Sequence, residues 1–139
     1  MSEDEIIEKL RPIHIRIRKK SGSVSEHTKS AQEITNAWQD IVCEGKSESE
    51  IDSEVKVLEH NDERIDIVDF TNRIAYELKV SGKNPHHEFY KDLIKVLTYN
   101  CNSEQKIRKL VFISEMNGIN SLEGRIDPTL ERCCQKITK

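Results

Sequence analysis

The fold is decided by two neighbouring runs of sequence, RIDIVDF at 64–70 and IAYELKV at 74–80, which TNR at 71–73 joins. Apolar and polar residues alternate in both runs, and this period of two is typical of half-buried β-strands. Such a short connection between two strands predicts an antiparallel hairpin. A further run, VKVL at 55–58, precedes a turn at 61–62 and predicts another strand. We therefore expect consecutive antiparallel hairpins.

Helical patterns flank these strands. Residues 24–44 carry apolar side chains three or four apart and end before Gly45, as amphipathic helices commonly do. Residues 86–100 show the same spacing, and KLVFIS at 109–114 is dense enough in apolar residues for a buried strand. The order helix, three strands, helix, strand predicts an α/β fold with a mixed sheet flanked by helices.

The two ends of the chain are predicted to add helices to this core. A first helix is expected over residues 2–20, kinked or split by Pro12, and a short last helix over residues 128–137. The length of 139 residues is usual for one domain. We expect a single domain (1–139) made of an N-terminal helical extension (1–22), a core (23–114) and a C-terminal loop and helix (115–139).

The composition excludes several classes of protein. Hydrophobic residues make up 35% of the chain and charged residues 34%, and no apolar run approaches the roughly 20 residues that span a bilayer. The N-terminus lacks the basic and then apolar layout of a signal peptide, so a cytoplasmic location is expected. The four cysteines form no CxxC pair and predict neither a zinc knuckle nor a redox motif. A net charge of -3 does not indicate nucleic-acid binding by the whole molecule but permits a local basic surface.

Acidic residues stand inside the two central strands, where a buried charge needs a partner or a metal ion. Asp66 and Glu77 lie on neighbouring strands, side by side if both face the same way. Two such carboxylates repel each other unless a cation lies between them, and oxygen ligands suit Mg²⁺ or Mn²⁺. Lys79 follows Glu77 by two residues and so projects from the same face. Asp69 is an alternative ligand, although its offset from Asp66 turns it to the other face.

RIDIVD at 64–69 and YELKV at 76–80 resemble the core motif of the PD-(D/E)xK nucleases. That superfamily includes type II restriction endonucleases and archaeal Holliday-junction resolvases. The order of predicted elements agrees with this resemblance over residues 24–114. The resemblance implies a restriction-endonuclease-like fold and a Mg²⁺-dependent (or Mn²⁺-dependent) endonuclease that hydrolyses the phosphodiester bonds of DNA.

The resemblance also implies roles for single residues in the two strands. Asp66 and Glu77 would be catalytic and would hold the metal together with the Leu78 carbonyl. Lys79 would be the catalytic lysine, which orients the attacking water. The metal would stabilise the negative charge that develops on the phosphate.

Further residues are implied on the two helices. Many members of the family add a catalytic glutamate from the first core helix; Glu33 fits that place, and Glu26 is the alternative. Some relatives carry a glutamine and a tyrosine four residues apart on the following helix, where this chain has Lys95 and Tyr99. The candidates for contacting DNA are Lys83, Lys91, Lys95 and Tyr99.

Other interpretations of the same residues stay open. Asp66 and Glu77 can be exposed strand residues that form surface salt bridges across the hairpin with Arg64, Arg73 or Lys79. The chain can also be a nuclease-like domain that binds nucleic acid or a partner protein without cutting, or a plain interaction domain in which the two carboxylates lie far apart.

One chain supplies one candidate site, whereas cutting both strands of a duplex takes two sites or a rebinding step. We therefore expect a homodimer or a partner subunit acting on DNA, with no membrane involved. The N-terminal segment is the candidate contact because it is amphipathic and precedes the core; its apolar residues are Ile6, Ile7, Leu10 and Ile13.

Overall fold

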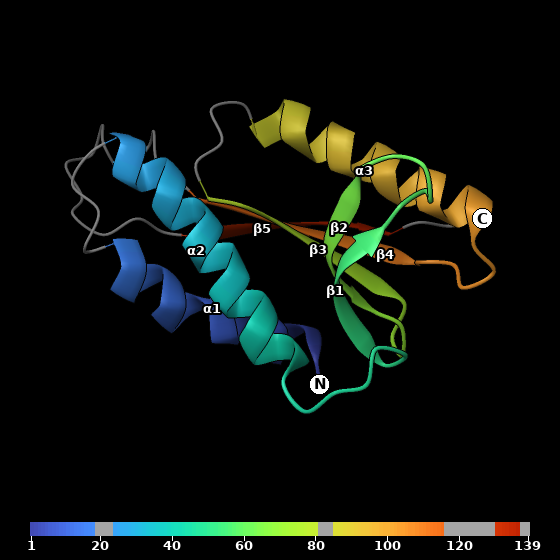
Figure 1. The fold of residues 1–139 in the computed structure, drawn as a ribbon, viewed down its shortest axis with the longest axis horizontal. Coiled ribbons are helices and arrows are strands. Elements are labelled where there is room, and N and C mark those ends of the chain that lie inside the picture. The colour runs from blue at the N-terminus through green and yellow to red at the C-terminus, as the bar shows by residue number, and fades with distance from the viewer. Residues whose placement is uncertain (19–23, 81–84, 116–129, 137–139) are drawn as a thin grey trace.

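A mixed five-stranded sheet with helices on both faces forms the protein, as the computed structural model describes it over residues 1–18, 24–80, 85–115 and 130–136 (Figure 1). Its strands, adjacent in chain order, are β1 (Ile51–Lys56), β2 (Arg64–Asp69), β3 (Ile74–Lys79), β4 (Lys109–Glu115) and β5 (Leu130–Lys136). The helices are α1 (Glu3–Arg18), α2 (Val24–Cys43) and α3 (Pro85–Asn102). The pair β3–β4 is parallel and the other pairs are antiparallel. The predicted α/β class with a mixed sheet is therefore confirmed, and no helix in these ranges is long and apolar enough to cross a membrane.

Two apolar clusters cover the two faces of the sheet. On one face α1 and α2 pack against the strands, and Trp38 of α2 meets Tyr76 of β3 edge to face, with ring centroids 6.5 Å apart. On the other face Val96 of α3 belongs to the same cluster as Ala75 of β3. Because Tyr76 faces α2 and Ala75 faces α3, the alternation of β3 turns Glu77 toward α3.

The helix α1 is a layer of the core and not an extension of it. Ile6 and Leu10 have no exposed surface, and the indole N–H of Trp38 donates to the Ile6 carbonyl at 2.9 Å. The helix runs unbroken through Pro12, so the predicted split is wrong. The apolar side chains that were expected to contact a second subunit are instead buried within the chain and are not available for that contact, namely Ile6, Ile7, Leu10 and Ile13.

Two strands differ from the prediction. Residues 130–136 form the strand β5, which pairs antiparallel with β4. The helix predicted over residues 128–137 is therefore wrong for these residues. The free edge of β4 explains the difference, because its unpaired backbone groups favour a partner strand over an isolated helical turn. The strand β1 begins at Ile51, before the expected start, although its polar stretch has no clear strand pattern. Pairing with β2 imposes this start.

A buried ionic network fastens α1 to the ends of β3 and β4. Glu115, at the end of β4, accepts hydrogen bonds from His14 Nε2 at 2.5 Å and Arg18 Nε at 2.8 Å. Arg18 also donates to the carbonyl of Val80, just after β3, at 2.7 Å. Burial alone would raise the pKa of Glu115, but the hydrogen bonds from His14 and Arg18 outweigh it and lower that pKa. The network therefore fixes the end of β3 beside Lys79.

Leu10→Ala should lower the free energy of unfolding by about 2–5 kcal/mol, because it removes a fully buried side chain and leaves a cavity. Leu97→Ala is the matched control: its side chain on α3 is 44% exposed, and the change should cost less than about 1 kcal/mol. Urea unfolding followed by circular dichroism measures both. Equal losses for the two variants would show that α1 is not part of the core.

Candidate functional site

The strands β2 and β3 stop pairing at the level of Asp66 and Glu77. The register between them ends at the pair Ile67↔Tyr76. Beyond that pair the Asp66 N–H donates to Glu77 Oε1 at 3.3 Å, and the Leu78 N–H donates to Asp66 Oδ2 at 2.8 Å. Each carboxylate thus accepts a backbone N–H of the opposite strand. We call this opening, formed by Asp66, Glu77 and Leu78, the fork.

The other edge of β2 is interrupted at the same residue. Glu54 of β1 stands opposite Asp66 but is skipped by the β1–β2 register, and its φ is 52°. This left-handed conformation is strained for a residue other than glycine. The Asp66 carbonyl instead accepts a hydrogen bond from Gln39 Nε2 of α2 at 2.9 Å, and the same nitrogen donates to Glu54 Oε1 at 3.1 Å. Both backbone polar groups of Asp66 therefore bond to side chains.

The helix α3 brings a third carboxylate and an ammonium group to the fork. Lys95 Nζ lies 2.9 Å from Glu77 Oε1 and 3.3 Å from Asp92 Oδ1, and it donates to the Arg64 carbonyl at 2.7 Å. Asp92 is 1% exposed, and neither of its carboxylate oxygens has a hydrogen-bond partner among the described residues. The lysine ammonium thus lies between a carboxylate of β3 and one of α3.

A second lysine lies near the same group. Lys79 Nζ is 3.2 Å from Glu88 Oε2 of α3, and both side chains are partly exposed. Four carboxylates therefore face two ammonium groups, and the fully ionised cluster has an excess of two negative charges. The carboxylates are those of Asp66, Glu77, Glu88 and Asp92, and the ammonium groups are those of Lys79 and Lys95.

The ionisation of these groups reflects burial and crowded charge. Burial raises the pKa of Asp66 to about 6. Burial, followed by the charges of Asp66 and Asp92, raises the pKa of Glu77. Burial would lower the pKa of Lys95, but the charges of Glu77 and Asp92 outweigh it and raise that pKa. Asp66 and Glu77 thus bind protons more readily than in water, and Lys95 stays charged.

Of the residues expected from the strands, the structure places Asp66 and Glu77 side by side, with Lys79 on the face of β3 that Glu77 occupies. The two arginines considered as their salt-bridge partners bond elsewhere. Arg64 donates to the Glu54 carbonyl, and Arg73 donates to the carbonyl of Lys106. The cation that contacts Glu77 is Lys95, from a helix and not from the hairpin.

The residue of α2 that reaches the fork is not the expected glutamate. Glu33 is exposed on α2, whereas Gln39 is 4% exposed and bonds to Asp66. The side chain of Glu26, the alternative, lies outside the described residues, and so does Lys83. Only a weak sequence signal pointed to Gln39. It is a polar residue next to Trp38 on the apolar side of the helix, and it belongs to no motif.

Two of the residues expected to contact DNA have largely buried side chains in this structure. Tyr99 is 8% exposed and belongs to the apolar cluster between α3 and the sheet. Lys95 turns inward, because the carboxylates of Glu77 and Asp92 attract its ammonium. Lys91 is exposed on α3 and stays a candidate for contacting phosphate.

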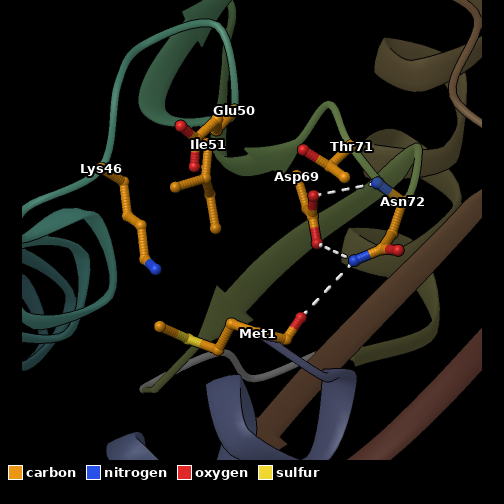
Figure 2. A pocket seen from close by; sticks show the side chains of 7 residues that line it. All are labelled: Met1, Lys46, Glu50, Ile51, Asp69, Thr71 and Asn72. Carbon is orange, nitrogen blue, oxygen red and sulfur yellow. Dashed lines mark hydrogen bonds between the residues drawn. The ribbon is translucent and has the colours of Figure 1, made fainter.

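Asp69, the alternative ligand on β2, lies at the end of the strand, beside the turn that carries Thr71 and Asn72 (Figure 2). Its Oδ1 accepts the backbone N–H of Asn72 at 3.0 Å, and its Oδ2 accepts the Asn72 side-chain amide at 2.7 Å. It lines a small cavity of about 120 Å³ with residues that include Met1 and Lys46. Asp69 therefore holds the turn between β2 and β3.

The carboxylate oxygens of Asp66 and Glu77 at the fork suit a hard divalent cation. The two buried oxygens of Asp92 that lack a hydrogen-bond partner support this fit.

No family model, curated protein or solved structure matches the chain. Across the described ranges, no three Asp, Glu, His or Cys side chains enclose a space for a metal ion, and Lys95 Nζ stands between Glu77 and Asp92.

Asp66→Asn should stabilise the metal-free protein increasingly as pH rises from about 4 to about 6. The pKa of Asp66 is higher in the folded state than in the unfolded state, so its ionisation costs stability over that interval. The gain relative to wild type should grow by about 3 kcal/mol between pH 4 and neutral pH, because one pKa unit corresponds to about 1.4 kcal/mol. Urea unfolding in a chelator at several pH values measures it.

Asp62→Asn is the control for this titration, because Asp62 is exposed in the loop between β1 and β2. It removes the same carboxylate charge at a position away from the fork. The difference in unfolding free energy between Asp66→Asn and wild type should grow with pH. A difference that stays constant or shrinks as pH rises would contradict the raised pKa of Asp66.

Proposed function

We propose that the protein is a divalent-metal-dependent endonuclease that hydrolyses phosphodiester bonds in DNA. The observation that carries the proposal is the fork, where Asp66 and Glu77 insert carboxylates between two strands and share an excess of negative charge. Structural hydrogen bonding alone does not require three buried carboxylates around one ammonium group. An additional cation would relieve this imbalance.

The arrangement of elements also favours a restriction-endonuclease-like fold. The chain order α2, β1, β2, β3, α3, β4 has an antiparallel meander followed by a helical crossover to a parallel strand. This order agrees with the resemblance of RIDIVD and YELKV to the PD-(D/E)xK motif. Both carboxylates of that motif fall at the place where β2 and β3 separate.

In this proposal the residues of the fork divide the work. Asp66 and Glu77 hold Mg²⁺ or Mn²⁺ together with the Leu78 carbonyl. When bound, the metal would supply a Lewis acid that makes water a better nucleophile and offsets charge on the phosphate. Lys79 is 32% exposed; it leaves its ion pair with Glu88 and contacts the attacking water instead. There its ammonium stabilises the charge that develops in the transition state. Lys91 contributes a phosphate contact from α3.

The substrate in this proposal is DNA, and a second cut in a duplex requires a second fork. We propose that a second copy of the chain or a partner subunit supplies it. Its contact surface lies outside the buried apolar face of α1.

A second function, a nuclease-like domain that binds without cutting, is favoured by the engagement of both lysines. Lys95 already neutralises part of the charge on Glu77, and Lys79 is paired with Glu88. If these ion pairs are permanent, the cluster is a structural element and the protein would bind nucleic acid or a partner protein through other surfaces.

Lys79→Met should reduce DNA cleavage by about 10²-fold or more, the scale of losing one preorganised charge in a transition state. It should leave the Mn²⁺-induced rise in melting temperature in place, because the lysine is not a metal ligand. Cleavage of labelled duplex, single-stranded and branched DNA with Mg²⁺ or Mn²⁺ measures the first effect, and thermal denaturation measures the second.

Lys56→Met is the matched control, because Lys56 is exposed at the end of β1. It should cut as fast as wild type. If wild type cuts none of these substrates, or if Lys79→Met and Lys56→Met cut equally well, the proposed role of Lys79 is wrong, and the binding function gains support.

A further inference from the structure

The ammonium of Lys95 occupies a position lined by oxygen atoms. Its nearest partners are Glu77 Oε1 at 2.9 Å, Asp92 Oδ1 at 3.3 Å and the Arg64 carbonyl at 2.7 Å. Two carboxylates and a carbonyl are also the ligand types that Mg²⁺ and Mn²⁺ take from proteins. Lys95 therefore stands where a divalent cation would find ligands.

Asp92 has fewer partners than a buried carboxylate needs. It is 1% exposed, and among the described residues it forms an ion pair with Lys95 at 3.3 Å. Its second oxygen, Oδ2, is buried without a hydrogen-bond partner among the described residues. A buried carboxylate is normally satisfied by several donors or by a metal ion. The free oxygen of Asp92 therefore indicates a further cation on the fork side of α3.

The Lys95 side chain is partly open to solvent. It is 13% exposed, and its flexible four-carbon stem carries a strongly hydrated ammonium. A doubly charged ion would meet the excess of two negative charges better than a single ammonium does. Removing Lys95 from the carboxylates has a cost, so it would lower the apparent affinity for the metal.

We propose that Lys95 and a divalent cation compete for Glu77 and Asp92, so that Lys95 closes the site without metal and metal binding drives it into solvent. Asp92 then serves as a third carboxylate facing the ion, beside Asp66 and Glu77. This competition rests on the proposed metal-dependent function and adds to it a threshold: the site stays closed until the metal concentration suffices to displace Lys95.

Mn²⁺ binding to the full chain, measured from the electron paramagnetic resonance signal of free Mn²⁺, tests the competition. Lys95→Met should bind Mn²⁺ about tenfold more tightly than wild type, and Asp92→Asn about tenfold more weakly. Lys91→Met, the change one turn earlier on an exposed face of α3, should bind like wild type. If Asp92 served Lys95 alone, Asp92→Asn would bind Mn²⁺ as tightly as wild type or more tightly.

The failures of the two proposals are distinguishable. If wild type binds Mn²⁺ and Lys95→Met binds it no more tightly, the competition is wrong and the metal site stands. If neither protein binds Mn²⁺, both the competition and the metal-dependent function are wrong.

Chemical acetylation of the wild-type protein keeps the test valid if Lys95→Met does not fold. With Mn²⁺ present, the rate of acetylation of Lys95, followed by peptide mass spectrometry, should rise severalfold as the ammonium enters solvent. The rate at exposed Lys91 provides the internal control and should not change. An unchanged or lower rate at Lys95 in saturating Mn²⁺ would overturn the proposal.

Discussion

The carboxylates of Asp66 and Glu77 accept backbone N–H groups from opposite strands, and the rest of the site depends on this exchange. A buried N–H without a partner costs as much as a lost hydrogen bond, so the strands can separate only where side chains replace their pairing. The replacement satisfies the backbone, but it places two carboxylates in one gap. The position of Lys95 between Glu77 and Asp92 follows from that crowding, and burial together with the neighbouring carboxylates raises the pKa of Glu77.

The topology explains why α3 provides the cation. Because β3 and β4 are parallel, the chain must cross one face of the sheet to travel between them, and α3 makes this crossing. The face it covers is the one from which Glu77 projects. The opposite face is filled by α1 and α2, and the Glu115 network with His14 and Arg18 ties α1 to the ends of the parallel pair. The helix α3 therefore both packs on the sheet and carries Lys95 and Asp92 to the fork.

Much of the fold was predictable because its elements have strong periodic patterns. The alternation in RIDIVDF and IAYELKV places Asp66 and Glu77 on neighbouring strands, and the helices α2 and α3 are close to their expected limits. The strand β5 and the early start of β1 were not predictable, since both depend on pairing with a neighbouring strand and not on local propensity.

The candidate site was predictable only where it follows from strand alternation. Gln39 reaches Asp66 because Glu54 leaves the ladder in a strained conformation, and no sequence pattern announces that strain. Lys95 has the helical spacing of a surface lysine, yet the charge of Glu77 and Asp92 draws it inward. The direction of the Lys95 side chain is thus set by its charge interactions, above all with Glu77 of a different element, and not by helical periodicity.

The most direct measurement of the central claim is anomalous X-ray diffraction from crystals grown with saturating Mn²⁺. A divalent-cation site at the fork predicts one strong anomalous peak in contact with the carboxylates of Asp66 and Glu77, with Lys95 Nζ withdrawn from Glu77. The account would be contradicted by crystals in which the fork carries no peak and Lys95 still lies between Glu77 and Asp92.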